Sequence, residues 1–186
     1  MKSIKQFIYF IAALVIANGA FAQPAEKTVE VGGAPMYPTK NIIQNAMNSK
    51  DHTTLVEAIK AAGLVETLEG AGPFTVFAPT NEAFNALPAG AVEMWLKPEN
   101  KQKLQSILTY HVVAGRWDSK ALGELIKKGN GKAEIKTVQG GTIWAMMKGN
   151  KIILKDEMGK IATVTITDVY QSNGVILVVD QVLMPK

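Results

Sequence analysis

Several segments between residues 39 and 129 place their hydrophobic positions with the period of an amphipathic helix. Between residues 54 and 62 the positions that share one face are Leu55, Ala58, Ile59 and Ala62. Thr54 and Glu57 have the spacing of a capping box, in which each side chain binds a free backbone N–H of the first turn. Gly63 then fits the left-handed position that ends many helices. The pattern predicts a helix over this segment.

Further helical segments follow Thr39, Thr80, Pro98 and Ser119, each of which suits the start of a helix. In the segment after Pro98 the hydrophobic stripe consists of Leu104, Ile107 and Leu108. The next position on that stripe, seven residues after Leu104, is His111. We therefore expect the imidazole of His111 to point toward the core.

From residue 142 onward the period changes from helical to strand-like alternation. Residues 142–155 contain two alternating stretches around Gly149-Asn150, a pair suited to a tight hairpin turn. Residues 162–169 alternate hydrophobic side chains with threonines. Residues 174–179, GVILVV, form an uninterrupted hydrophobic run, which is typical of a strand buried on both faces. With one earlier strand-like stretch, FTVFA, this order predicts an α+β fold in a single domain.

The first 36 residues follow neither pattern. Residues 1–22 combine a basic start, the apolar core FIYFIAALVIA and the sequence Ala20-Phe21-Ala22, which is typical of a signal peptide and its cleavage site. The apolar core is shorter than the about 20 residues of a membrane-spanning helix. Residues 23–36 are rich in Gly, Pro and charge, and we expect a flexible lead-in to a domain over residues 37–186. The sequence predicts a secreted or periplasmic protein without a membrane span after signal cleavage.

Composition narrows the classes of function. The chain has no cysteine, which excludes disulfides and thiolate chemistry. It has 20 lysine and arginine residues against 16 acidic residues, a net charge of +4. Removing residues 1–22 takes away Lys2 and Lys5 and no acid, so the net charge falls to +2. This balance does not favour a nucleic-acid partner, which calls for a clustered basic face.

Four blocks of the sequence resemble the fasciclin domain family. GPFTVFAPTNEAFNALP, at residues 72–88, resembles the first signature block of the family. LQSILTYHVVAGRW, at residues 104–117, resembles the second block with its Tyr-His pair. NGVILVVDQVLMP, at residues 173–185, is similar to the closing block, and TLVEAIKAAGLVETL, at residues 54–68, to an early helix. The chain looks like the small, exported, single-domain bacterial members.

This resemblance implies a wedge of mostly antiparallel β-strands with helices packed on one side. It also implies a non-catalytic adhesion or binding module that uses no cofactor and recognises a protein or polysaccharide partner at the cell surface or envelope. Leu177 stands where the closing block often has histidine. The chain lacks the Asp-Ile dipeptide of integrin-binding animal members, so integrin binding is not expected of it.

The resemblance makes Tyr110 and His111 candidate binding residues, because the Tyr-His pair has been tied to adhesion in animal members. It also implies that the two signature blocks lie side by side, which adds Thr80 and Asn81. The residues themselves favour a simpler interpretation. A buried His111 would hydrogen-bond the turn at Thr80-Asn81, and Tyr110 would cover the core edge with its hydroxyl on solvent or on a backbone group.

Catalysis by His111 is the weakest alternative. A hydrolase would need a nucleophile within reach of the imidazole and an acid to orient the ring. The chain has no GxSxG motif, and Ser106 or an acidic residue would have to serve with His111. No catalytic residue is therefore assigned.

Trp144 and Met146 are candidates for a docking surface. In a half-buried strand these two side chains face one way, and Ala145 and Met147 face the other way. One of these faces belongs to the core, and an exposed Trp-Met strip on the other would suit a partner. The remaining alternative is a small-ligand carrier with an apolar pocket behind this strand.

Metal chemistry has little support in the sequence. A zinc site needs three or four ligands, whereas the chain has two histidines, His52 and His111, which we expect to lie apart. His52, in SKDHTT, is interpreted as an exposed turn residue. No DxDxDG loop indicates a calcium site, and no metal is assigned.

Overall fold

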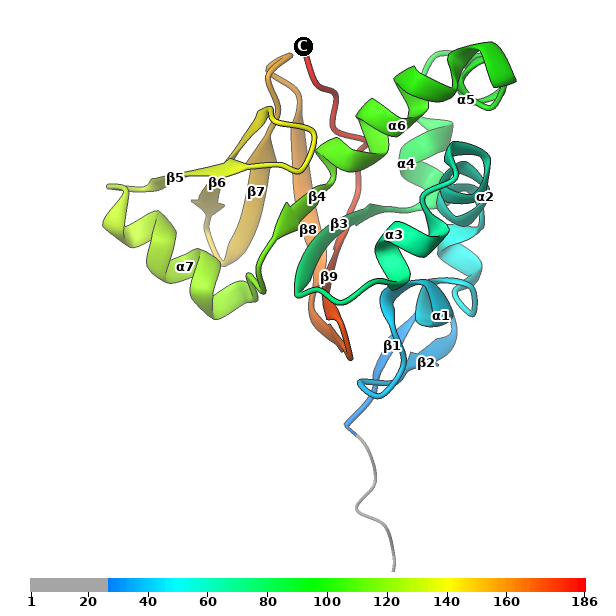
Figure 1. The fold of residues 1–186 in the computed structure, drawn as a ribbon. Helices are drawn as coiled ribbons and strands as arrows, with labels where there is room; N and C mark the ends of the chain where they lie inside the picture. Colours follow the sequence, from blue (N-terminus) through cyan, green and yellow to red (C-terminus); the bar gives the residue numbers. More distant parts are fainter. Residues whose placement is uncertain (1–26) are drawn as a thin grey trace, which may run out of the picture.

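The computed structural model describes residues 27–186, so the predicted signal peptide lies outside the described residues. The strands of the main sheet are β3 (Phe74–Pro79), β4 (Val112–Ala114), β5 (Lys132–Lys136), β6 (Thr142–Lys148), β7 (Lys151–Lys155), β8 (Ile161–Gln171) and β9 (Gly174–Val179). They form one sheet in the order β4-β3-β9-β8-β7-β6-β5 (Figure 1). Every neighbouring pair is antiparallel except β3 and β9, which run parallel.

The helices are α1 (Ile42–Ala46), α2 (Thr53–Ala62), α3 (Val65–Glu69), α4 (Asn81–Asn85), α5 (Ala91–Trp95), α6 (Lys101–Tyr110) and α7 (Ser119–Lys128), with 3-10 turns η1 (Lys50–His52) and η2 (Pro98–Asn100). Helices α1 to α6 gather on one side of the molecule, and α7 lies apart against β5 and β6 (Figure 1). The predicted α+β wedge is confirmed. Within residues 27–186, no helix combines the length and hydrophobicity that crossing a membrane requires.

Strand β9 occupies the middle of the molecule, and all of its residues are buried. Its side chains alternate between two hydrophobic cores. Ile176 and Val178 pack in the core shared with α1 to α6, and Leu177 and Val179 pack in the core shared with α7. Leu177, which stands where the resembled closing block often has histidine, is fully buried. It contributes an apolar side chain to the core shared with α7.

Other local predictions are confirmed as well. The turn at Gly149-Asn150 joins β6 to β7. Gly63 ends α2 in the left-handed conformation, with φ of 71°. The stripe of α6 is buried and ends on a buried His111. Local sequence was sufficient in these cases because each feature depends on residues within one or two turns.

The structure differs from the predicted flexible lead-in at residues 29–36. Strands β1 (Val29–Val31) and β2 (Ala34–Met36) form an antiparallel hairpin. Val31 is 4% exposed and Met36 is 3% exposed, and the N–H of Lys50 donates to the carbonyl of Gly32 at 3.2 Å. Each strand is three residues long and buries one side chain, which is too little to show a period in the sequence. The folded part of the described chain therefore starts at the hairpin.

Candidate functional site

His111 is 2% exposed at the end of α6. Its Nδ1 lies 2.8 Å from the carbonyl oxygen of Ile107, and its Nε2 accepts the N–H of Leu183 at 3.0 Å. Because a carbonyl only accepts, Nδ1 carries the proton and the ring is neutral. Burial lowers the pKa of His111 to about 4. Both ring nitrogens are bound to backbone groups, so neither is free for a nucleophile or a partner.

The hydrogen-bond partner of His111 corrects the prediction. The expected turn at Thr80-Asn81 does not bind the imidazole; the segment after β9 does. The two signature blocks are joined by the backbone, because the N–H of Phe77 donates to the carbonyl of His111 at 2.9 Å. Strands β3 and β4 pair directly after His111, which brings the two backbones together and leaves the ring to face Leu183.

Tyr110 is fully buried. Its hydroxyl donates to the carbonyl of Thr142 at 2.7 Å and accepts the N–H of Glu157 at 3.2 Å. Burial raises the pKa of Tyr110 to about 12. The predicted backbone contact is present, but the ring lies inside the core and not at its edge. Tyr110 thus joins α6 to the start of β6 and to the turn between β7 and β8.

Thr80 and Asn81 organise two helix starts. The hydroxyl of Thr80 accepts the N–H of Ala83 at 3.3 Å and caps α4. The side chain of Asn81 accepts the N–H of Thr54 at 3.0 Å and donates to the carbonyl of Lys50 at 2.8 Å. The first turn of α2 is therefore bound by Asn81, and the predicted capping box at Thr54 does not form. Both residues hold segments together away from His111.

His52 is buried, whereas the sequence predicted an exposed turn residue. It is 3% exposed rather than solvent-facing, and its Nδ1 lies 2.8 Å from the hydroxyl oxygen of Ser49. Burial lowers the pKa of His52. Within residues 27–186, no group of three or more His, Asp or Glu side chains could hold a metal ion.

The apolar cavity inside the helical core gives little room for a carried ligand. The apolar cavity beside His52, between the β1–β2 hairpin and the sheet, has a volume of about 20 Å³. That is enough for about one water molecule, whereas ligand pockets typically measure several hundred Å³. The pocket that the sequence suggested behind the Trp-Met strand is filled, because Ala145 is fully buried in the core shared with α7.

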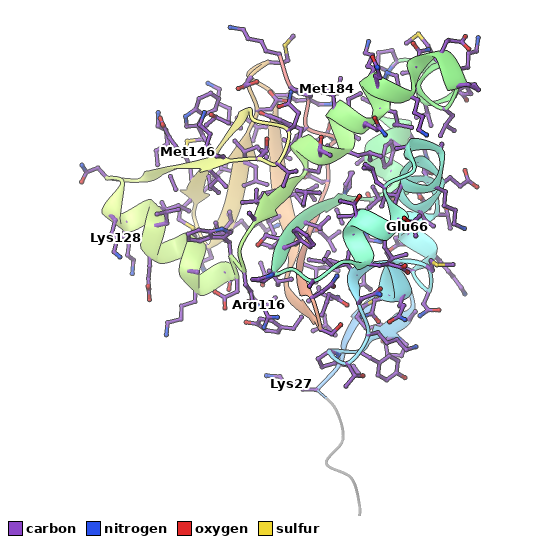
Figure 2. The ribbon with its side chains drawn as sticks, in the orientation of Figure 1. Lys27, Glu66, Arg116, Lys128, Met146 and Met184 are labelled. Carbon is purple, nitrogen blue, oxygen red and sulfur yellow. The ribbon has the colours of Figure 1, made fainter. Side chains whose placement is uncertain are left out.

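Trp144 and Met146 lie on the outer face of the sheet, away from α7. Both are half-buried and line an open groove of about 460 Å³ together with Lys132, Lys155 and the turn at residues 156–159. Figure 2 shows Met146 on these strands, across the molecule from Glu66 of α3. The Trp-Met strip that the sequence singled out is thus partly exposed and lines a groove.

Polar and charged groups hold the tryptophan side chain. The indole N–H of Trp144 donates to Glu134 at 3.1 Å. The ammonium group of Lys132 lies 5.9 Å from the ring centroid of Trp144, within the range of a cation–π contact. Lys132 also forms an ion pair of 3.8 Å with Glu134. These contacts place the ring at the wall of the groove.

The end of the groove is fixed to the core through Glu157. Its N–H binds the hydroxyl of Tyr110, and its carboxylate accepts the N–H groups of Thr142 at 3.0 Å and Lys186 at 3.2 Å. Of the residues that the sequence singled out, Trp144 and Met146 meet at the surface. Tyr110 contacts the end of the groove through its hydrogen bond with Glu157. Thr80, Asn81 and His111 do not line the groove.

Sequence reasoning missed the lysines of the groove. Lys132 belongs to β5, KAEIK, where the burial alternates strictly between exposed and buried residues. That alternation is visible in the sequence as a period of two. Lys155 is placed by its pairing with Trp144 across β6 and β7, which no local pattern reveals.

Comparisons with known proteins agree with this architecture. The model of the fasciclin domain matches residues 50–185. Protein sll1483 of Synechocystis is 42% identical, and the alignment covers 100% of this chain and 99% of that protein. The cell surface glycolipoprotein MPB83 of Mycobacterium bovis is 30% identical over 94% of this chain and 74% of its own length.

A solved structure shares the fold. It is a domain pair from the insect cell adhesion molecule Fasciclin I, with a TM-score of 0.53 and 25% identity over 68% of this chain and 43% of that chain. The family is associated with adhesion and is generally non-catalytic, and neither of the two named relatives carries an enzyme's name. The match to the family model and the identity to sll1483 show that this chain belongs to the fasciclin domain family.

Proposed function

We propose that this chain is an exported, non-catalytic adhesion or binding module that contacts its partner through the outer face of β5, β6 and β7. The partly exposed pair Trp144 and Met146 beside the open groove supports this proposal most directly. Tryptophan is among the residues that most often dominate the energy of an interface. The partner is a protein or a polysaccharide at the cell surface or envelope, which fits a secreted or periplasmic location.

The geometry of His111 supports a binding module over a hydrolase. A general base must have a ring nitrogen within hydrogen-bond reach of the nucleophile. Here one nitrogen is bound to Ile107 and the other to Leu183. A nucleophile such as Ser106 would first have to displace one of these backbone bonds from a buried ring.

The test compares surface substitutions of the same chemical kind. Trp144→Ser and Met146→Ser are expected to weaken binding of the mature protein to cell-envelope preparations by about tenfold, which corresponds to 1.4 kcal/mol. Met94→Ser is the matched control, because Met94 is 45% exposed on α5. Urea denaturation of each variant measures its stability.

The proposal requires that the two outer-face variants lose binding while their unfolding midpoints stay near that of the parent. If Met94→Ser weakens binding and Trp144→Ser does not, the contact surface lies on the helical side. If Trp144→Ser unfolds the protein, this face belongs to the core and the docking surface must be sought elsewhere.

A further inference from the structure

The charge of the protein is unevenly distributed along the chain. Residues 116–160, which contain α7, β5, β6 and β7, hold ten basic and five acidic residues, a net charge of +5. The rest of the chain after residue 22 holds eight basic and eleven acidic residues, a net charge of −3. The small net charge of the whole chain therefore hides a basic segment and an acidic remainder. The lobe that carries the groove is therefore the basic part of the molecule.

Five lysines of this lobe lie at one end of it. They are Lys127 and Lys128 in the last turn of α7, Lys132 at the start of β5, and Lys148 and Lys151 beside the β6–β7 turn. Lys132 pairs with Met146 near the end of β6, which places the start of β5 beside that turn. Figure 2 shows Lys128 at the outer tip of the lobe. We call these five side chains the basic end.

The basic end is exposed and mostly unpaired. All five lysines are exposed. In the described part of the chain, the ion pair that involves them is the one between Lys132 and Glu134. The ammonium groups of the other four bind no protein group within residues 27–186. Their charges are available to a partner.

Fold stability accounts for only part of this cluster. Lys127 and Lys128 interact favourably with the dipole at the end of α7, and a lysine on the edge strand β5 discourages pairing with other chains. Lys148 and Lys151, however, are direct cross-strand partners. Like charges in that position destabilise a hairpin. An anion that binds both lysines removes this repulsion.

We propose that the basic end binds an acidic polysaccharide. This inference rests on the proposed function, because it names the chemistry of the partner. Protein interfaces are enriched in arginine and depleted in lysine, and the basic end contains lysine alone. Lysine acts as a point charge on a flexible stem, which suits the carboxylates or sulfates spaced along a flexible sugar chain. Nucleic-acid sites typically stack several bases on aromatic side chains among the basic residues. The basic end has one cation–π contact within residues 27–186, between Lys132 and Trp144.

Lys132 connects the basic end to the groove. Its ammonium group faces the ring of Trp144, and Lys155 is the cross-strand partner of Trp144 on β7. A sugar chain held by the basic end can therefore continue along the groove, where the indole offers an apolar surface to a sugar ring. In this arrangement the lysines supply the attraction and Trp144 supplies the contact specificity.

Calorimetric titration with oligogalacturonate, a polymer of uronic acids, tests the inference. The mature protein is expected to bind it and not dextran, a neutral sugar polymer. Raising the salt concentration from about 50 to 200 mM is expected to lower the affinity at least tenfold, because binding releases counterions. Lys148→Glu/Lys151→Glu is expected to lower the affinity at about 50 mM salt by at least tenfold.

Lys97→Glu/Lys101→Glu is the matched control, because it makes the same charge change at two exposed lysines on the helical side. It should alter the affinity less than about twofold, and both variants should keep the unfolding midpoint of the parent. Equal losses in the two double variants, equal binding of dextran, or tighter binding of duplex DNA or an acidic polypeptide than of oligogalacturonate overturns the inference.

The same experiments separate this inference from the proposed function. If the protein binds envelope preparations through Trp144 but does not bind oligogalacturonate, the binding module stands and the acidic polysaccharide is wrong. If it binds neither, both proposals fail.

Discussion

At the residue scale, the polar side chains that the sequence marked as binding candidates join distant segments of the fold. His111 binds Leu183, Tyr110 binds Thr142, and Asn81 binds the first turn of α2. A buried polar group destabilises the protein unless it is hydrogen-bonded. The buried His111 and Tyr110 therefore contribute through the partners they satisfy, and the partly exposed Asn81 does so at the start of α2.

His111→Ala is expected to destabilise the protein by about 2–4 kcal/mol, because it leaves a cavity and strands the N–H of Leu183. His111→Gln, which keeps a hydrogen-bonding group, should cost less. Chemical denaturation of both variants measures the effect. An unchanged midpoint and slope for His111→Ala would contradict the structural role.

The pH dependence of stability gives a second test of His111. Its pKa falls from 6.5 in the unfolded chain to about 4 in the native protein. As pH drops from 6.5 to 4, the unfolded state takes up a proton that the native state does not, so stability is lost in this window and is fully present above it. The loss from His111 is about 3 kcal/mol at most.

His111→Gln should therefore lose less stability than the parent between pH 7 and pH 4. Urea midpoints across this range measure the difference. The pKa of His52 is also lowered by burial, and its effect is common to both proteins and cancels in the comparison. Parallel pH profiles of parent and variant would show that His111 titrates normally in the native state.

At the element scale, the start of α2 depends on another segment of the chain. We expect Asn81→Ala to destabilise the protein by about 1–3 kcal/mol, because the N–H of Thr54 and the carbonyl of Lys50 both lose a partner. Glu57→Ala should change stability by less than about 0.5 kcal/mol, because Glu57 is exposed and caps nothing. If Glu57→Ala destabilises the protein more than Asn81→Ala in thermal or urea unfolding, the capping box of Thr54 and Glu57 starts α2 instead.

The β1–β2 hairpin is expected to contribute to the free energy of unfolding as much as a buried core residue does. Met36→Ala should cost about 2–4 kcal/mol, since Met36 is 3% exposed in the helical core. Met47→Ala, the same change at a residue that is 57% exposed, should stay within about 0.5 kcal/mol. Similar unfolding midpoints for the two variants would mean that the hairpin is a loose extension.

The local hydrophobic pattern predicted those helices and strands that bury several side chains at a regular spacing. Helix α2 shows four buried positions at helical spacing, and β9 is a hydrophobic run bounded by Asn173 and Asp180. The hairpin at β1–β2 was missed because each strand buries one side chain. Short helix α5 was missed because its single buried residue, Trp95, defines no stripe.

At the scale of the whole molecule, residues 116–160 are basic and the remaining residues after 22 are acidic. The predicted signal peptide adds an expected location outside the cytoplasm. We expect the exported protein to begin at Gln23, because Ala20-Phe21-Ala22 precedes it as a cleavage site. Intact-mass measurement of the protein recovered from the secreted or periplasmic fraction decides this. A mass that includes residues 1–22 would contradict cleavage and point to an anchored form.

The sequence by itself determined the α+β class, the family resemblance, the burial of His111 and the turn at Gly149-Asn150. Each of these depends on residues that are close in the chain or on a linear motif. The tertiary structure alone decided that His111 binds Leu183, that Asn81 binds α2 and that His52 is buried. It alone gathered the five lysines of the basic end and set Lys132 over Trp144. Hydrogen bonds and charge clusters between remote segments depend on how sheets and helices pack, and no local period records that packing.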